Sequence, residues 1–251
     1  MKRQKIVAGN WKMNKNLAEG QELAQQIADR LPDSEVELII CTPFIHLASV
    51  ASFTAGKSNY HLGAQNCSEH ASGAYTGETS VGMLASAGVE YVIVGHSERR
   101  SYYNEDNATL AAKTNAILAG GLLPIFCCGE PLEIREAGTH VDLVDTQLKE
   151  GLFHLSADEF KKVVIAYEPV WAIGTGVTAS PEQAQEMHAA IRKMIADQYG
   201  DEIADATTIL YGGSVKPNNA KELFGQPDVD GGLVGGASLK ADDFIAIAES
   251  Y

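Results

Sequence analysis

Short apolar runs recur along this chain, and the segments between them carry apolar residues at helical spacing. Eight of the runs have the length and the branched or aromatic content of β-strands. Several, such as Val92-Ile93-Val94, are apolar at every position, which is typical of strands buried on both faces. The eight expected strands are Lys5–Ala8, Val36–Cys41, Tyr60–Ala64, Tyr91–Val94, Leu122–Cys127, Val163–Tyr167, Thr207–Tyr211 and Gly231–Val234.

Several intervening segments carry helix signals. Leu17–Leu31 has apolar residues every four positions, and Asn104–Leu118 is rich in alanine with its apolar residues on one face. Ser180 and Pro181 predict the start of a long helix, because Ser caps helices and Pro fits the first helical position. Ala241–Glu249 is the last expected helix.

The alternation of strands and helices predicts the fold. About eight strand–helix pairs in a chain of 251 residues match a (β/α)8 barrel in count and length. A doubly wound sheet is the alternative, but it favours Gly-x-Gly-x-x-Gly after the first strand, where this chain has Gly9-Asn10-Trp11-Lys12. No linker or low-complexity tract divides the chain. The sequence therefore predicts one barrel domain over residues 1–251.

The charge and the cysteines narrow the possible functions. A formal net charge of −14 argues against nucleic acid and anionic membranes as partners, and it requires any anion site to be built locally. Cys41, Cys67, Cys127 and Cys128 form no Cys-x-x-Cys pair, which indicates buried thiols in a reducing compartment. The N-terminal apolar stretch is too short for a signal peptide, and no run reaches membrane-spanning length. We expect a soluble, cytoplasmic protein.

Polar residues gather directly after the expected strands. In a barrel the carboxyl ends of all strands meet on one face, so these side chains are expected to converge there. They are Asn10, Lys12, Gln65, Asn66, His96, Ser97, Glu98, Glu130, Glu168, Ser214, Gly235 and Gly236. The histidines show no metal-ligand spacing, so no metal site is expected.

Three of these residues have types suited to acid–base chemistry. Glu168 has apolar neighbours, and partial desolvation would make its carboxylate a stronger base. His96 begins a polar segment that can form a helical turn, and the positive end of a helix favours the neutral imidazole. Lys12 offers a compact ammonium to a phosphate or a developing enolate oxygen. Each also has an ordinary structural interpretation, as an ion-paired carboxylate, a core histidine or a solvated lysine.

Glycine pairs follow the last two expected strands, in Tyr211-Gly212-Gly213-Ser214-Val215 and Leu233-Val234-Gly235-Gly236-Ala237-Ser238. Glycines let backbone N–H groups approach a phosphate closely, and these barrels often bind phosphate after their last two strands. Together with Gly95-His96-Ser97-Glu98-Arg99-Arg100 and Tyr167-Glu168-Pro169-Val170-Trp171-Ala172-Ile173-Gly174-Thr175-Gly176, these blocks resemble the triosephosphate isomerase family. The resemblance runs through essentially the whole chain.

The resemblance implies an isomerase of triose phosphates that needs no cofactor or metal. Glu168 would be the base, His96 the neutral electrophile and Lys12 the group that stabilises negative charge, with Asn10 donating a hydrogen bond nearby and Glu98 supporting Lys12. Backbone N–H groups of Gly174, Ser214, Gly235 and Gly236 would bind the phosphate.

The resemblance also implies two loops. The loop Ala172–Val177 would be a lid hinged at Pro169-Val170-Trp171 and Val177-Thr178-Ala179; the family often has Lys at the position of Val177. The segment Gln65–Glu78 would insert into a second subunit of a homodimer, with Thr76 near the partner's catalytic residues.

Two other functions remain open on the sequence. Another phosphosugar barrel enzyme, such as a Schiff-base aldolase, would need a desolvated lysine at a strand end, and Lys12 is the candidate. A non-catalytic barrel would be expected to lack Glu168, His96 or Lys12, and all three are present.

Overall fold

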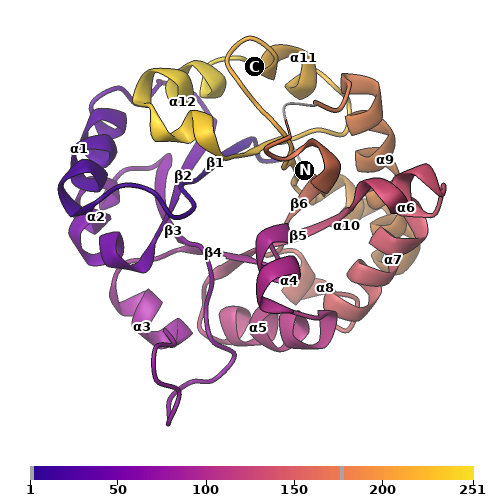
Figure 1. Cartoon of the computed structure of the whole chain (residues 1–251), viewed down its shortest axis with the longest axis horizontal. Coiled ribbons are helices and arrows are strands. Elements are labelled where there is room, and N and C mark those ends of the chain that lie inside the picture. The colour runs from indigo at the N-terminus through magenta and orange to yellow at the C-terminus, as the bar shows by residue number, and fades with distance from the viewer. Residues whose placement is uncertain (1–2, 176–177) are drawn as a thin grey trace.

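A computed structural model of the chain describes residues 3–175 and 178–251. Its parallel strands close into a barrel in which each strand pairs with the next along the chain and β8 pairs with β1 (Figure 1). The (β/α)8 fold class is therefore confirmed. The strands are β1 Ile6–Asn10, β2 Glu37–Thr42, β3 Tyr60–Ala64, β4 Tyr91–Val94, β5 Leu123–Glu130, β6 Val164–Pro169, β7 Ile209–Tyr211 and β8 Gly231–Val234.

Helices surround the barrel on all sides in Figure 1. The α-helices of the described residues are α1 Leu17–Ala28, α2 Leu47–Thr54, α3 Val81–Ser86, α4 Ser97–Tyr103, α5 Asn107–Ala119, α6 Leu132–Glu136, α7 His140–Gly151, α8 Ala157–Phe160, α9 Pro181–Tyr199, α10 Asp201–Ala206, α11 Ala220–Phe224 and α12 Ala241–Ala248. Short 3₁₀ turns are η1 Phe44–His46, η2 Val170–Ala172 and η3 Gly236–Leu239.

Alternate residues of each strand serve two different cores. Those that point into the barrel form one cluster, which includes Ile39, Ile93 and Ile125. Their neighbours along the strands, such as Ile40 and Val94, pack outward against the helices in a second and larger cluster. Both faces of each strand are therefore apolar, which explains why the strand sequences do not alternate with polar residues.

The helix signals predict α1, the start of α9 and α12 correctly, and they fail at the start of α5. Ser180 caps α9, accepting a hydrogen bond from the backbone N–H of Gln183, and Pro181 is the first helical residue, as predicted. The expected helix Asn104–Leu118 is wrong at its start. Asn104 has a φ of 55° and ends α4, and Asp106 then caps the next helix, α5. A left-handed residue cannot continue a right-handed helix, so α5 begins at Asn107, three residues later than predicted.

Four strands, β1, β2, β5 and β6, extend further toward the carboxyl end than predicted, and the last two matter most to the site. β5 continues to Glu130 and β6 continues to Pro169, because Gly129 pairs with Glu168 and Glu130 pairs with Pro169. The side-chain amide of Gln147 from α7 completes this region by bonding both the N–H and the carbonyl of Gly129, at 2.8 and 3.0 Å. The strand end that carries Glu168 is thereby fixed to β5, and β5 to a helix.

Gly129 is the position where β5 and β6 approach most tightly. A methyl group at Gly129 would overlap the backbone carbonyl of Glu168. We expect Gly129→Ala to lower the free energy of unfolding by about 1–3 kcal/mol, since it overpacks a closed strand pair. Urea unfolding followed by circular dichroism measures this.

Gly82→Ala is the matched control. Gly82 lies in α3, where an added methyl group meets only the distant Ser80 hydroxyl, at 3.9 Å. Replacing a helical glycine with alanine should raise stability by about 0.5–1 kcal/mol. If both variants changed stability equally, the close approach of β5 and β6 would not be the cause.

Candidate active site

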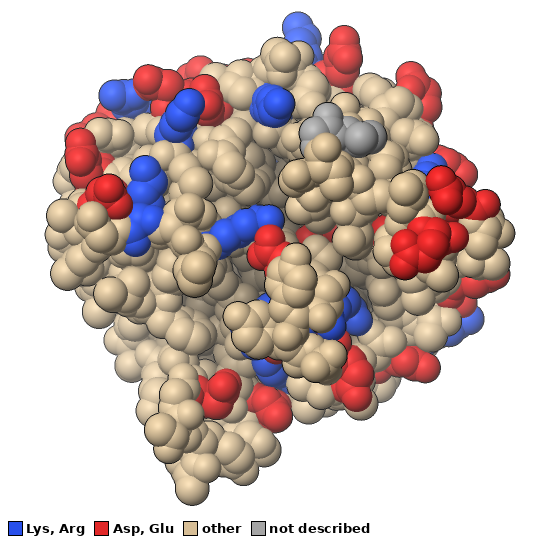
Figure 2. Space-filling model, in the orientation of Figure 1, with Lys and Arg blue, Asp and Glu red and all other residues tan. Residues whose placement is uncertain are grey.

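A cavity of about 670 Å³ opens at the carboxyl ends of the strands. Figure 2 shows cationic and acidic side chains meeting over the middle of the barrel. The sequence-predicted residues that line the cavity come from segments far apart in the chain; they are Asn10, Lys12, His96, Gly174, Ser214, Gly235 and Gly236. A cavity of this size suits a small molecule.

Glu168 lies on β6, 1% exposed; it does not line the cavity itself but contacts His96 and Gly212, which do. Its carboxylate accepts hydrogen bonds from the backbone N–H of Ser97, at 2.9 Å, and from the Ser97 hydroxyl, at 3.0 Å. The same carboxylate lies 3.1 Å from Nε2 of His96. Gly212 makes room for it, because a methyl group there would lie 2.9 Å from Cγ of Glu168. The carboxylate is thus buried but fully surrounded by polar partners and a small residue.

His96 is the N-cap of α4, which settles its tautomer. Its Nδ1 accepts a hydrogen bond from the backbone N–H of Glu98, at 3.2 Å. A nitrogen that accepts carries no proton, so Nε2 bears the hydrogen. The helix turn expected after His96 is therefore present, and it orients the Nε2–H toward Glu168.

The backbone just before His96 needs glycine. Gly95 has a φ of 74°, and a methyl group there would lie 3.0 Å from the carbonyl oxygen of Cys127. The guanidinium of Arg100 donates to the carbonyl of Gly95 at 2.9 Å and to that of Cys127 at 3.1 Å. These bonds fasten the end of β4 to β5 and hold His96 in place.

Lys12 reaches the cavity from the loop after β1. Its ammonium lies 2.5 Å from the carboxylate of Glu98, and its backbone N–H donates to the side-chain oxygen of Asn10 at 3.0 Å. The Lys12 side chain is half-buried and lines the cavity, so the ion pair does not close it off from the cavity. Asn10, Lys12, His96 and Glu98 thus form one connected polar group.

The glycine-rich segments form another part of the cavity wall, referred to below as the glycine-rich wall. Gly174 has a φ of 70°, and Gly235 is the N-cap of η3, which begins at Gly236. Ser214 follows β7 on the same wall. The structure therefore brings these four residues together, with Lys216 and Lys240 beside them, which the sequence had not suggested.

The structure corrects the prediction for Glu130 and adds a contact of Ser97 that the sequence did not predict. Glu130 ends β5 at the carboxyl face, but it is fully buried and lines neither cavity; its Oε1 accepts from the Tyr167 hydroxyl at 3.0 Å and the Trp171 indole at 2.9 Å. Ser97 was not predicted to bind Glu168, since the two are 71 positions apart and no local pattern joins them. In the expected lid, Gly176 and Val177 lie outside the described residues.

The cysteines stay protonated thiols. All four are buried and unpaired, as predicted. Burial raises the pKa of Cys128 to about 12 and raises the pKa of Cys127 well above its ordinary value. A thiol of this kind is a poor nucleophile at neutral pH, so cysteine chemistry does not compete with the polar group described above.

This arrangement suits proton transfer beside a carbonyl group in a small anion. It combines a carboxylate base, a neutral N–H donor, an ammonium and a glycine-rich wall around one cavity. The family model of triosephosphate isomerase matches residues 5–251. The chain belongs to the triosephosphate isomerase family.

Relatives in this family align over nearly their whole length. The triosephosphate isomerase of Cytophaga hutchinsonii is 58% identical over 252 residues, covering 99% of this chain and 100% of that protein. That of Phocaeicola vulgatus is 57% identical, with 99% of each chain covered. That of Flavobacterium johnsoniae is 51% identical, with 98% of each covered.

The Ser97 hydroxyl is a further test of the site geometry. We expect Ser97→Ala to lower the free energy of unfolding by about 1.5–3 kcal/mol, because a buried carboxylate loses a hydrogen-bond donor. Chemical unfolding near neutral pH measures the change. In a Glu168→Gln background the same substitution should cost clearly less, because the charge is gone. Equal losses in both backgrounds would contradict the contact.

Proposed function

We propose that this chain interconverts dihydroxyacetone phosphate and D-glyceraldehyde 3-phosphate by proton transfer through an enediolate, with Glu168 as the base. The isomerase activity on triose phosphates, and with it a place in glycolysis and gluconeogenesis, follows from membership of the family. The observation that carries the assignment of the base is the 3.1 Å approach of its carboxylate to Nε2 of His96 at the edge of the cavity.

Glu168 and His96 divide the proton transfers between them. Glu168 removes a proton from the carbon next to the carbonyl and returns it to the neighbouring carbon. The Nε2–H of His96 donates to the carbonyl oxygen, which stabilises the negative charge that develops there, and the ring moves protons between the two oxygens. The acceptor bond at Nδ1 supports this role because it keeps the proton on Nε2.

Lys12 and Asn10 stabilise negative charge on the same side of the substrate. The ammonium of Lys12 is already oriented by Glu98, so little reorganisation is needed when the enediolate forms. The Asn10 side chain lines both the main cavity and a smaller one beside it, and it also holds the backbone of Lys12. We assign Glu98 the role of supporting Lys12 without touching the substrate.

The phosphate is bound by the glycine-rich wall. We assign backbone N–H groups of Gly174, Ser214, Gly235 and Gly236 to its oxygens, since glycine allows close approach of the backbone. Binding energy from the phosphate positions the reacting carbon against Glu168. Closure of the loop Ala172–Val177 over the substrate would exclude water and strengthen the electrostatic interactions.

An aldolase of the Schiff-base type is disfavoured by the surroundings of Lys12. A lysine that attacks a carbonyl must be uncharged, and this requires a desolvated site or a cationic neighbour. Here the neighbour is the carboxylate of Glu98 at 2.5 Å, which stabilises the charged ammonium.

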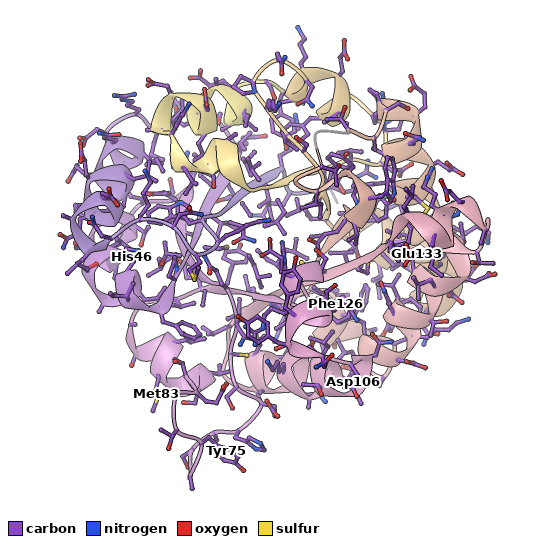
Figure 3. All side chains as sticks on the ribbon, viewed as in Figure 1. His46, Tyr75, Met83, Asp106, Phe126 and Glu133 are labelled. Carbon is purple, nitrogen blue, oxygen red and sulfur yellow. The ribbon has the colours of Figure 1, made fainter. Side chains whose placement is uncertain are left out.

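The role of Glu168 is tested by Glu168→Asp in a coupled assay with glyceraldehyde 3-phosphate. The shorter side chain withdraws the carboxylate from the substrate by about 1 Å, and we expect kcat to fall on the order of 10²-fold. Glu133→Asp is the control, because Glu133 is exposed on α6, at the rim of the molecule in Figure 3. An unchanged rate in Glu168→Asp would remove Glu168 from its role.

We also propose a homodimer built through the segment Gln65–Glu78, in the cytoplasm. The segment projects from the barrel and carries few charged side chains (Figures 1 and 2). It is internally ordered, because the rings of His70 and Tyr75 stack at 3.9 Å and the backbone N–H of Ser68 donates to the carbonyl of Thr79. In this proposal Thr76, next to Tyr75 at the tip, reaches the partner's catalytic residues.

The surface around the smaller cavity supports a dimer. Met13 and Tyr103 line this cavity beside Lys12 and are themselves 96% and 66% exposed. Large exposed apolar side chains next to a hollow mark an interaction site. The residues of this cavity would receive the projecting segment of a second copy.

No helix in the described part of the chain is long and apolar enough to cross a membrane.

Analytical ultracentrifugation tests the dimer. We expect the wild type to sediment at twice the chain mass of 26.8 kDa, and Tyr75→Asp to shift toward the monomer with lower activity, because a charge enters an apolar contact. Leu132→Asp is the control, since Leu132 is similarly exposed but lies on α6, away from the segment (Figure 1). A monomeric wild type would refute the proposal.

A further inference from the structure

The loop that carries Lys12 follows a strained backbone path. Lys12 has a φ of 52° and Lys15 has a φ of 71°. Residues with a side chain seldom adopt this left-handed conformation, and strain of this kind persists only where the surroundings hold it. The position of the Lys12 ammonium therefore depends on the groups that fix this short loop.

Side chains hold the loop at several points. The side-chain oxygen of Asn10 accepts from the Lys12 N–H, Gln65 donates to the Lys12 carbonyl at 2.9 Å, and Asn14 donates to the Trp11 carbonyl at 2.7 Å. All three of these side chains line one of the two cavities. A fourth contact comes from behind the loop, where Nε2 of His46 lies 3.1 Å from the carbonyl oxygen of Lys15.

His46 is fully buried at the junction of η1 and α2 (Figure 3). A carbonyl oxygen only accepts hydrogen bonds, so Nε2 carries the proton and donates to Lys15. The other nitrogen, Nδ1, has no partner among the described residues. The ring also meets the indole of Trp11 edge-on, with centroids 5.8 Å apart. The imidazole thus contacts the loop at its first and last residues.

The space for this ring is made at a cost to the local stability of α1. Gly20 is the fourth residue of α1, and a methyl group there would lie 2.5 Å from Nδ1 of His46. Glycine weakens a helix relative to alanine, and a buried nitrogen without a partner is also unfavourable. Alanine at position 20 with an apolar residue at position 46 would remove both unfavourable features, the helical glycine and the unpartnered nitrogen. A sequence that departs from two local preferences for stability at one place indicates a functional requirement there.

We propose that His46 is a positioning residue, which sets the place of the Lys12 ammonium in the active site by tethering Lys15 and supporting Trp11. The proposal rests on the role of Lys12 in the proposed function. His46 lines neither cavity, so it does not touch the substrate and acts only through the loop. A substitution there changes the site without removing any group that binds the substrate.

The test compares His46→Leu with His46→Gln by steady-state kinetics. Leucine cannot donate a hydrogen bond to Lys15, so the loop and the Lys12 ammonium should shift. A shift of about 1 Å can cost about 10²-fold in rate, and we expect a smaller shift to lower kcat/KM about tenfold. Glutamine can place an N–H near the position of Nε2, and it should retain kcat/KM within about threefold of wild type. Thermal unfolding of both variants separates this effect from a loss of fold.

Val50→Ala is the control for stability. Val50 is fully buried in α2 but has no contact with the carbonyl of Lys15, so the variant should unfold at a lower temperature and keep the wild-type kcat/KM. Gly20→Ala is a second probe that leaves His46 in place. The added methyl group should push the ring toward the loop and lower kcat/KM, while it improves the helix.

A double mutant decides whether His46 acts through Lys12. If it does, Lys12→Ala and Lys12→Ala/His46→Leu will have the same kcat/KM, because the group to be positioned is absent. A further tenfold loss in the double mutant would overturn the proposal, as would an unchanged kcat/KM in His46→Leu. Wild-type activity of Lys12→Ala alone would instead refute the proposed role of Lys12.

Discussion

The closure of eight parallel strands into one ring is the constraint on which the site depends. Parallel pairing places every carboxyl end on the same face, and the fixed register of β5 with β6 determines how far the carboxylate of Glu168 projects. That carboxylate then meets Ser97, 71 positions away, at the end of β4. Neither strand could hold its residue alone, because the contacts that orient each side chain come from a neighbouring strand or helix.

The ring also explains how an acidic protein can bind an anion. The formal net charge is −14, yet the main cavity is lined by Lys12, Lys216 and Lys240, with Asp243 as the acidic residue among the described residues around it. Local charge and oriented backbone dipoles act over a few ångströms, whereas charges on the outer helices are screened by salt. The net charge of the whole molecule therefore affects a bound phosphate less than the residues in the loops after the strands do.

The sequence was sufficient for the fold and for many residues of the site, but not for Lys216 and Lys240 in the cavity wall. Strand-length apolar runs and the polar residues after them carry a local signal, so the strand order, Glu168, His96 and Lys12 could be located from it. Contacts made through space left no such signal. The sequence placed Glu130 with the polar residues at the mouth, and only the pairing of β5 with β6 shows it buried below Trp171. Likewise, one alanine-rich stretch did not reveal the left-handed Asn104 that separates two helices.

The chain contains two tryptophans, and they lie beside two different segments of the site, the loop after β1 and the segment after β6. Trp11 is buried behind the loop of Lys12, against the ring of His46, whereas Trp171 is half-buried at the root of the loop over the cavity, with its indole N–H on Glu130 and the guanidinium of Arg135 above its ring at 5.4 Å. Since one indole is in an apolar setting and the other lies between opposite charges, their emission should differ in wavelength. The protein therefore contains two natural fluorophores that can be told apart, one beside the loop of Lys12 and one beside the segment after β6.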